Sequence, residues 1–244
     1  MIYACEHHDA VLEHWQLRDT RDIRLVHVDF HDDLRGLLVD RRQRLAYPIG
    51  RAARSWPMVD PGNFLAHAVV QGRVRGIRWL HERIGGRGWD AGIVRYESDL
   101  SAAHHRLAHR LRRGPEYPLE FEEGLLESWG GLKRGELLSV DWDCFASILT
   151  ERTTIDTRVT AFLEGLGSVI PEHTWVAYSP EYSHPSLDPF KRFVQRLGER
   201  FAQPVEWLSP GLPAGQLHPT DVDASLPRSP LMRLTLYLRR KGIF

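Results

Sequence analysis

Runs of valine, isoleucine and leucine alternate along the chain with segments whose apolar residues recur at helical spacing. Strands buried in a parallel sheet read as continuous apolar runs, whereas a helix that covers a sheet repeats its apolar residues about every 3.6 positions. The order therefore predicts an α/β protein, a single-domain three-layer αβα sandwich with a mainly parallel sheet. Strands are expected at Ile2–Cys5, Arg24–Asp29, Gly76–Leu80, Gly92–Arg95, Leu137–Trp142, Thr174–Tyr178 and Val205–Leu208. Helices are expected at Ala10–Leu17, Asn63–Gln71, Ser101–Arg112, Thr157–Leu166, Pro189–Phe201 and Ser229–Arg240.

Two stretches lack such a pattern. Residues 34–61 are basic and weakly periodic, which predicts a long loop with little more than one helical turn. Residues 209–227 carry four prolines and two glycines and are expected to be irregular. Neither stretch resembles a flexible linker, so the 244 residues are expected to form one domain over 1–244.

Acidic and imidazole side chains cluster where two of the apolar runs end. They are Asp29, His31 and Asp33 after one run, and Asp141 and Asp143 after another. The carboxyl ends of parallel strands meet at one rim of the sheet, and alternate residues of an extended chain point to the same side, so these groups are expected to converge. Clustered carboxylates repel one another and cannot all ionise without cations. The sequence therefore predicts a metalloenzyme.

The donor types indicate which metals fit. Four aspartates and two histidines suit two octahedral divalent ions, and Mn²⁺ fits mixed carboxylate and imidazole ligands best, with Fe²⁺, Co²⁺ or Zn²⁺ as alternatives. The first strand ends in Glu-His-His-Asp at residues 6–9, which offers a further imidazole at the same rim. Three neighbours are expected to have other roles: His27 as a hydrogen-bonded core histidine, Asp32 pointing away from the ligands, and His7 as a surface or core residue.

The net charge and the hydropathy of the chain indicate which kinds of molecule the protein binds and where it is located. Lysine plus arginine and aspartate plus glutamate each total 32, so the formal net charge is zero. No long-range field attracts nucleic acid or an anionic membrane, and any partner must be recognised locally. The sequence has no basic segment followed by a long apolar stretch at its N-terminus, which predicts a soluble cytoplasmic protein. Two cysteines do not make a disulfide framework, and the oligomeric state stays open.

The paired signatures Asp29-x-His31-x-Asp33 and Ser139-x-Asp141-x-Asp143 resemble those of the arginase/deacetylase superfamily of metalloenzymes. Two further segments, residues 6–12 and residues 63–80, resemble the smaller branch that includes the peptide arginases of ribosomally made peptide natural products. The resemblance covers the chain up to Phe145 and is loose beyond it. The sequence departs from classical arginases in lacking a Gly-Gly-Asp-His segment and an Asp-Pro pair after the second cluster.

The resemblance implies an arginase-like fold and a site for two Mn²⁺ ions. One ion would be held by His8, Asp29, Asp33 and Asp141, and the second by Asp29, His31, Asp141 and Asp143. Asp29 and Asp141 would then bridge the ions, with a water or hydroxide between them.

A guanidinium substrate also needs a carboxylate, because the two oxygens of a carboxylate match its planar fork. Glu181 follows the expected strand Thr174–Tyr178 at the same rim, where the resemblance implies the guanidinium-binding residue; it could instead cap the next helix or face solvent. Glu6 and Asn63 are further substrate-binding candidates. The reaction also needs a residue that shuttles a proton, and His67 is the first candidate for this catalytic role, with His184 and His218 as alternatives. Each of these histidines could instead be structural.

Three functions remain open at this stage. The resemblance implies a Mn²⁺-dependent hydrolase that converts arginine residues of a precursor peptide to ornithine and urea, with free arginine as an alternative substrate. A deacetylase-like amide hydrolase would use one metal and an electrophilic tyrosine such as Tyr182. A metal-stabilised module could instead bind a peptide without chemistry. The number of bound ions separates the first function from the second.

Overall fold

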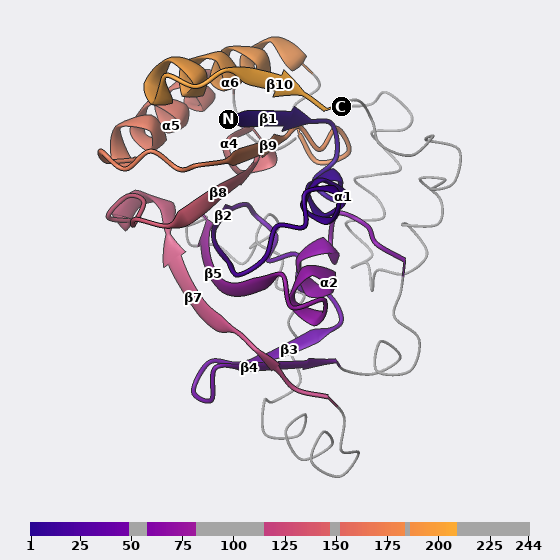
Figure 1. Ribbon diagram of the computed structural model, residues 1–244. Coiled ribbons are helices and arrows are strands. Elements are labelled where there is room, and N and C mark those ends of the chain that lie inside the picture. The colour runs from indigo at the N-terminus through magenta and orange to yellow at the C-terminus, as the bar shows by residue number, and fades with distance from the viewer. Residues whose placement is uncertain (49–57, 82–114, 147–151, 184–185, 209–244) are drawn as a thin grey trace, which may run out of the picture. The chain divides into compact units, whose positions relative to one another are not determined.

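The computed structural model describes residues 1–48, 58–81, 115–146, 152–183 and 186–208. Met1–Gly211 form one compact unit, and the remaining unit, Leu212–Phe244, lies wholly outside the described residues. The strands of the main sheet are β1 (Ile2–Cys5), β2 (Ile23–Val28), β5 (Val74–His81), β7 (Glu120–Leu125), β8 (Glu136–Asp141), β9 (Thr174–Ala177) and β10 (Val205–Trp207). They form a seven-stranded sheet in the order β10-β1-β9-β8-β2-β5-β7 (Figure 1).

All neighbouring strands of this sheet run parallel. Such a sheet must be covered on both faces, and its side chains alternate between them. In β1, Ile2 and Ala4 pack into one apolar cluster, whereas Tyr3 and Cys5 pack into another. The expected α/β class with a mainly parallel sheet is therefore confirmed.

Helices cover both faces. On the face of the sheet to which Tyr3 points lie α1 (Ala10–Leu17) and α2 (Phe64–Val70). On the opposite face, to which Ile2 points, lie α4 (Asp143–Ala146), α5 (Arg152–Gly165) and α6 (Leu187–Phe201). In α6, residues three or four apart, such as Phe190, Phe193 and Leu197, are buried on one stripe, which is why this segment forms a covering helix. The result is the three-layer arrangement of Figure 1.

The elements expected from apolar pattern occur in the expected order, with shifted ends. The helix expected at Thr157–Leu166 begins earlier, at Arg152, and the strand expected at Gly76–Leu80 begins at Val74. The expected strand Gly92–Arg95 and the expected helices Ser101–Arg112 and Ser229–Arg240 lie outside the described residues, as does the irregular stretch 209–227.

The prediction of a long loop over residues 34–61 is wrong for its first part. β3 (Leu37–Asp40) and β4 (Leu45–Pro48) form an antiparallel hairpin, and β6 (Tyr117–Pro118) extends it to a three-stranded sheet. The turn is held by the carboxylate of Asp40, which accepts hydrogen bonds from the amides of Arg42 and Gln43, both at 3.1 Å. All four residues of β3 are buried, so the two-residue alternation that would identify a half-exposed strand is missing. Residues 49–57 lie outside the described part.

The edge strand β7 was not predicted, because its sequence is largely acidic and it buries only Phe121 fully. It leads into a short 3₁₀ turn at Leu126–Ser128.

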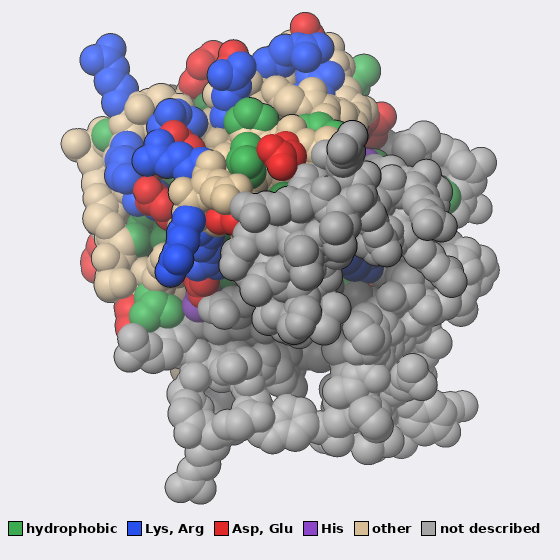
Figure 2. All heavy atoms as spheres, turned by 90° about the horizontal axis from the view of Figure 1, so that it is seen from below, with side chains coloured by type: hydrophobic (Ala, Val, Ile, Leu, Met, Phe, Trp, Pro, Cys, Tyr) green, Lys and Arg blue, Asp and Glu red, His purple; other side chains and the backbone are tan. Residues whose placement is uncertain are grey.

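Opposite charges lie next to one another on the described part of the face drawn in Figure 2. Ion pairs near β7 illustrate this: Arg44 lies 3.2 Å from Glu120, and Arg41 lies 3.0 Å from Glu123. Such mixing is in keeping with the zero net charge. Within the described part of the chain, every helix is too short or too polar to cross a bilayer.

Candidate metal centre

The candidate site lies at the carboxyl ends of neighbouring parallel strands. In the register of the sheet, Cys5 of β1 pairs with Ala177 of β9, and Ala177 pairs with Asp141 of β8. β2 ends at Val28, which pairs with Val140 of β8. The segments that leave these four strand ends carry the polar side chains that the sequence singled out. This is the rim at which open α/β sheets bind ligands.

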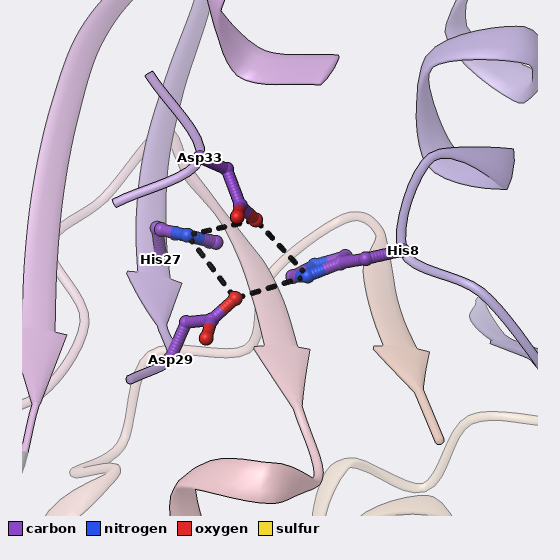
Figure 3. Close-up of side chains that lie close together, drawn as sticks. All are labelled: His8, His27, Asp29 and Asp33. Atoms are coloured by element: carbon purple, nitrogen blue, oxygen red, sulfur yellow. Dashed lines mark hydrogen bonds and ion pairs between the residues drawn. The ribbon is translucent and has the colours of Figure 1, made fainter. Parts of the chain in front are cut away.

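Four side chains form the first cluster, which Figure 3 shows. They are His8, His27, Asp29 and Asp33, each with one potential ligand atom within 4.8 Å of the others. Nδ1 of His8 lies 3.2 Å from Oδ2 of Asp29 and 3.4 Å from Oδ2 of Asp33. Nε2 of His27 lies 3.4 Å from each of these two oxygens. All four side chains are buried, so their charges are poorly screened by water.

A turn after β2 brings Asp33 into this cluster. Asp33 has a φ of 52°, in the left-handed region that aspartate tolerates better than most residues because its short side chain can bond locally. The amide of His31 donates a 2.7 Å hydrogen bond to Oδ1 of Asp29, which holds the start of the turn. The side chains therefore converge through a turn at Asp33, and not through a chain that stays extended.

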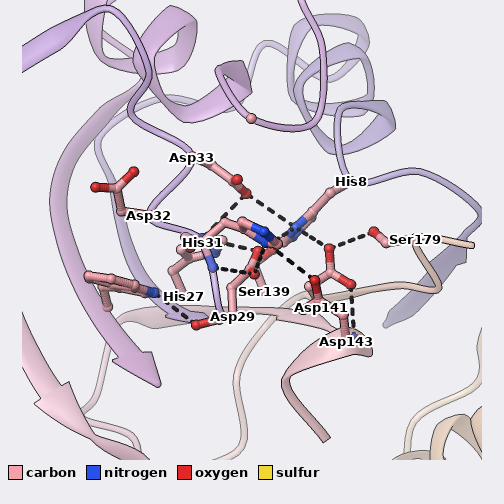
Figure 4. Close-up of polar contacts among 12 residues, drawn as sticks. His8, His27, Asp29, His31, Asp32, Asp33, Ser139, Asp141, Asp143 and Ser179 are labelled. Carbon is pink, nitrogen blue, oxygen red and sulfur yellow. Dashed lines mark hydrogen bonds and ion pairs between the residues drawn. The ribbon is translucent and has the colours of Figure 1, made fainter. Parts of the chain in front are cut away.

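His8 is oriented by a serine on β8. Its Nε2 lies 2.7 Å from Oγ of Ser139, and its Nδ1 faces the carboxylates (Figure 4). A proton on Nε2 that is donated to Ser139 leaves the lone pair of Nδ1 directed at the cluster. This is the usual arrangement of a histidine that binds a metal, with the second ring nitrogen fixed by a hydrogen bond.

His27 has a different role. Its Nε2 lies 3.0 Å from the carbonyl oxygen of His31, an acceptor, so this nitrogen is best protonated and donating. As a metal ligand Nε2 would have to lose that proton to Nδ1, which is buried without a hydrogen-bond partner among the described residues. Burial lowers the pKa of His27 to about 3, so the ring is neutral. His27 is thus a hydrogen-bonded core histidine, as expected. Its Nε2 faces the carboxylates of Asp29 and Asp33 from the end of β2.

The second cluster shares Asp29 with the first. Nδ1 of His31 lies 3.2 Å from Oδ1 of Asp29 and 3.2 Å from Oδ2 of Asp143. These three residues again lie within reach of one ion. Asp29 therefore presents Oδ2 to one cluster and Oδ1 to the other.

Asp141 lies between the two clusters. Its Oδ2 is 3.3 Å from Nδ1 of His8 and accepts a 2.5 Å hydrogen bond from Oγ of Ser179. Its Oδ1 accepts a 3.2 Å hydrogen bond from the amide of Asp143, the first residue of α4 (Figure 4). The structure thus brings together all six residues that the sequence nominated as ligands.

The pKa values of the carboxylates show that burial and mutual repulsion oppose their ionisation. Burial and the neighbouring Asp141 and Asp29 raise the pKa of Asp143 to about 8. Burial and the charge of Asp29 likewise raise the pKa of Asp33 well above its ordinary value. Burial opposes ionisation of Asp29 as well, but hydrogen bonds from His31 and His8 outweigh it and lower its pKa.

Buried oxygens without partners indicate what would complete the site. Oδ2 of Asp33 and both carboxylate oxygens of Asp143 are buried and accept no hydrogen bond among the described residues; imidazole nitrogens at 3.2 to 3.4 Å face the two Oδ2 atoms, and Oδ1 of Asp143 lacks even such a neighbour. An orphaned buried carboxylate is costly unless a cation compensates it. Oxygen donors with two imidazoles therefore fit divalent ions of the Mn²⁺ type, held by the residues of both clusters.

Without metal, we expect stability to fall as the pH rises from about 7 to about 9. Burial lowers the pKa of His8, but hydrogen bonds to Asp141 and Asp29 outweigh it and raise that pKa to about 9. With Asp143 near 8, the native state binds more protons than the unfolded chain in this range, so unfolding becomes more favourable with rising pH. Thermal unfolding of the metal-free protein at several pH values measures this. Mn²⁺ should weaken this dependence of stability on pH, because the bound ions replace the protons. A melting temperature that rises with pH in the metal-free protein would contradict the assignment of these side chains to a metal site.

No protein-family model matches the chain, and no curated sequence does either. Proclavaminate amidino hydrolase from Streptomyces clavuligerus aligns with a TM-score of 0.49 at 14% identity, over 82% of this chain and 64% of that one. An arginase from Medicago truncatula aligns with a TM-score of 0.44 at 12% identity, over 82% and 58%. A hypothetical agmatinase from Burkholderia thailandensis aligns with a TM-score of 0.40 at 16% identity, over 82% and 56%.

The chain spans about three-fifths of the length of these proteins. Similarity of this degree assigns no activity, so the chemistry of the site is inferred from its own side chains.

Glu181, Glu6 and His7 lie together at the exposed edge of the site. Nδ1 of His7 is 3.7 Å from Oε2 of Glu181, and its Nε2 is 4.0 Å from Oε1 of Glu6. The two glutamate side chains are 49% and 54% exposed, so both carboxylates are open to a ligand from solvent.

Asn63 is the residue just before α2, and His67 lies within that helix. The amide group of Asn63 is engaged in the turn before the helix: its Nδ2 donates to the carbonyl of Met58, and its Oδ1 accepts from the amide of Asp60, both at 2.9 Å. His67 is buried in the last turn of α2 and belongs to neither cluster of potential ligands. His184 and His218 lie outside the described residues.

Sequence reasoning missed the residue that holds Asp141, namely Ser179. Nothing in the apolar pattern distinguishes this serine, because its role depends on a left-handed turn that only the three-dimensional structure reveals. Ser139, by contrast, stands two residues before Asp141 on the same strand, so alternation could have identified it.

Proposed function

We propose that this protein is a two-metal hydrolase that acts on the guanidinium group of arginine residues in a peptide, leaving ornithine and releasing urea. The observation that carries the proposal is the position of Asp29, whose two oxygens face two different buried clusters, 3.2 Å from His8 and 3.2 Å from His31. A carboxylate shared in this way suits a pair of ions acting on one water, whereas a single structural ion needs only one cluster.

The residues that would hold the ions follow from the clusters. His8, Asp29 and Asp33 would bind one ion, and Asp29, His31 and Asp143 the other, with Asp141 between them. When bound, the two ions would lower the pKa of a water and stabilise the negative charge that develops during attack. Mn²⁺ is the ion that this donor set favours, with Fe²⁺, Co²⁺ or Zn²⁺ as alternatives.

The reaction is a hydrolysis. Water adds to the guanidinium carbon, the bond from that carbon to the side-chain nitrogen breaks, and both protons of the water pass to the departing nitrogen, which leaves as an ammonium group while the water oxygen stays on the carbon. The products are ornithine and urea. The guanidinium is a poor electrophile because its charge is delocalised, so binding must hold it close to the attacking water.

Glu181 is the proposed guanidinium-binding residue. It follows β9 at the rim of the site, and its half-exposed carboxylate can take both edge nitrogens of a guanidinium. Glu6 lies beyond His7 and gives the same edge a second negative charge. A peptide, rather than free arginine, is proposed because the sequence resembles peptide arginases over residues 6–12 and because this edge is open.

One observation favours the deacetylase-like alternative. The ring of Tyr182 lies 5.1 Å from that of His31, centroid to centroid, so this tyrosine packs against a residue of the second cluster. Such an enzyme would need a single ion and would consume acyl-lysine peptides. The shared Asp29 favours two ions and therefore the guanidinium substrate.

The test is urea release from a purified, Mn²⁺-loaded protein. We expect urea and a peptide containing ornithine when an arginine-containing peptide is supplied, and loss of both in Asp141→Ala, because that carboxylate stands between the clusters. Unchanged urea release in Asp141→Ala would remove the assignment. Turnover of free arginine alone would correct the substrate, and absence of turnover with acyl, phosphoryl and guanidino compounds in a metal-loaded protein would favour a binding module.

A further inference from the structure

Ser179 has a strained backbone at the end of a buried strand. Its φ is 48°, in the left-handed region that non-glycine residues rarely adopt, and its side chain is almost wholly buried. Pro180 follows, and the residue before a proline has a narrower choice of backbone conformations than others. Such strain persists only where surrounding contacts impose it, and it is concentrated at functional sites.

The backbone of Ser179 joins two segments of the site. Its amide donates a 2.8 Å hydrogen bond to the carbonyl of Glu6, next to the ligand His8. Its carbonyl accepts hydrogen bonds from the amides of Tyr182 and Ser183, both at 3.0 Å. The left-handed residue therefore closes a tight turn that carries Glu181 and Tyr182, and it ties this turn to the segment after β1.

The hydroxyl of Ser179 fixes a carboxylate that the metal clusters share. Oγ donates to Oδ2 of Asp141 at 2.5 Å, while the amide of Asp143 holds Oδ1 at 3.2 Å (Figure 4). Both oxygens of Asp141 are thus held by hydrogen bonds, one from the hydroxyl of Ser179 and one from the backbone of Asp143, and Oδ2 is kept 3.3 Å from Nδ1 of His8. Rotation of the carboxylate would break one of the two bonds.

We propose that Ser179 is a positioning residue that holds Asp141 in its metal-binding orientation while its left-handed backbone turns the segment 180–183 over the same site. The inference rests on the metal site of the proposed function and assigns to Ser179 no contact with a substrate. Partners that orient a ligand in this way commonly change metal affinity by about 10- to 100-fold when they are removed.

Two substitutions separate the hydroxyl from the backbone. Ser179→Ala removes the hydroxyl and keeps the Cβ, so the strain of the left-handed backbone is unchanged. Ser179→Thr keeps the hydroxyl but adds a branch at Cβ, which makes the left-handed backbone less favourable. Thr174→Val is the control, because it removes a buried hydroxyl at the other end of β9 that has no hydrogen-bond partner among the described residues.

The experiment is calorimetric titration of each metal-free variant with Mn²⁺, beside thermal unfolding of the same samples without metal. We expect Ser179→Ala to bind Mn²⁺ about 10- to 100-fold more weakly than the wild type. Ser179→Thr should melt at a lower temperature yet keep most of the affinity, and Thr174→Val should bind as the wild type does.

Wild-type affinity in Ser179→Ala would overturn the inference while leaving the two-metal site in place. Affinity that falls in Ser179→Thr as far as in Ser179→Ala would also overturn it, because the effect would then follow stability and not the hydroxyl. A wild-type protein that binds no Mn²⁺ would remove the proposed function itself, so the two failures are distinguishable.

Discussion

Replacing Asp29 by asparagine is expected to lower the affinity for both ions and to reduce urea release by more than about 100-fold, beyond the usual effect of a residue that only orients a ligand. Asp29 faces His8 with one oxygen and His31 with the other, so one substitution weakens both clusters. Asparagine preserves the size of the side chain and one oxygen, which limits disturbance of the turn held by the amide of His31.

Asp32→Asn is the matched control for this change. Asp32 is a fully buried aspartate three residues later, its Oδ1 accepts a 3.1 Å hydrogen bond from the amide of Leu34, and it belongs to neither cluster. Figure 4 shows its carboxylate turned away from the ligands. We expect Asp32→Asn to bind Mn²⁺ normally. Equal loss of binding in the two variants would mean that general disruption, not the shared carboxylate, explains the result.

Removal of metal by a chelator is expected to abolish activity and to lower the thermal stability. Without ions, the carboxylates of Asp33 and Asp143 must stay protonated or repel Asp29, as their raised pKa values indicate. Mn²⁺ at about 100 times its Kd stabilises a one-site protein by about 2.7 kcal/mol. For a chain of this size that amounts to a rise in Tm of about 5 to 10 °C.

The measurement is a melting curve and a urea assay on chelated protein before and after addition of Mn²⁺. Mg²⁺ at the same concentration is the comparison, because it prefers oxygen ligands and keeps its waters. Asp29→Asn should show little shift in Tm with either ion. Full activity in chelated protein, with no change of Tm on adding Mn²⁺, would exclude a metal-dependent reaction.

The parallel sheet could be predicted because its strands are buried on both faces and read as mainly apolar runs, as in Leu25–Val28 and Leu137–Val140, each broken by one polar residue. The hairpin of β3 and β4 escaped prediction because it depends on a local turn at Asp40 within a basic stretch. The edge strand β7 escaped because an exposed edge permits the acidic side chains that a central strand would exclude.

The convergence of the candidate ligands could be predicted because strand ends of a parallel sheet share one rim, which brings residues 8, 29–33 and 141–143 together. The backbone that achieves this could not be predicted. Asp33 and Ser179 both adopt left-handed conformations, imposed by contacts between segments far apart in the sequence. Local propensity disfavours such conformations, so only the assembled site reveals them.

The central claim is that two divalent ions share Asp29. Elemental analysis of protein reconstituted with Mn²⁺ and freed of excess metal tests it most directly, with Asp29→Asn measured alongside. We predict two Mn²⁺ per wild-type chain and fewer than one in the variant. One ion per wild-type chain, or none, would contradict the claim.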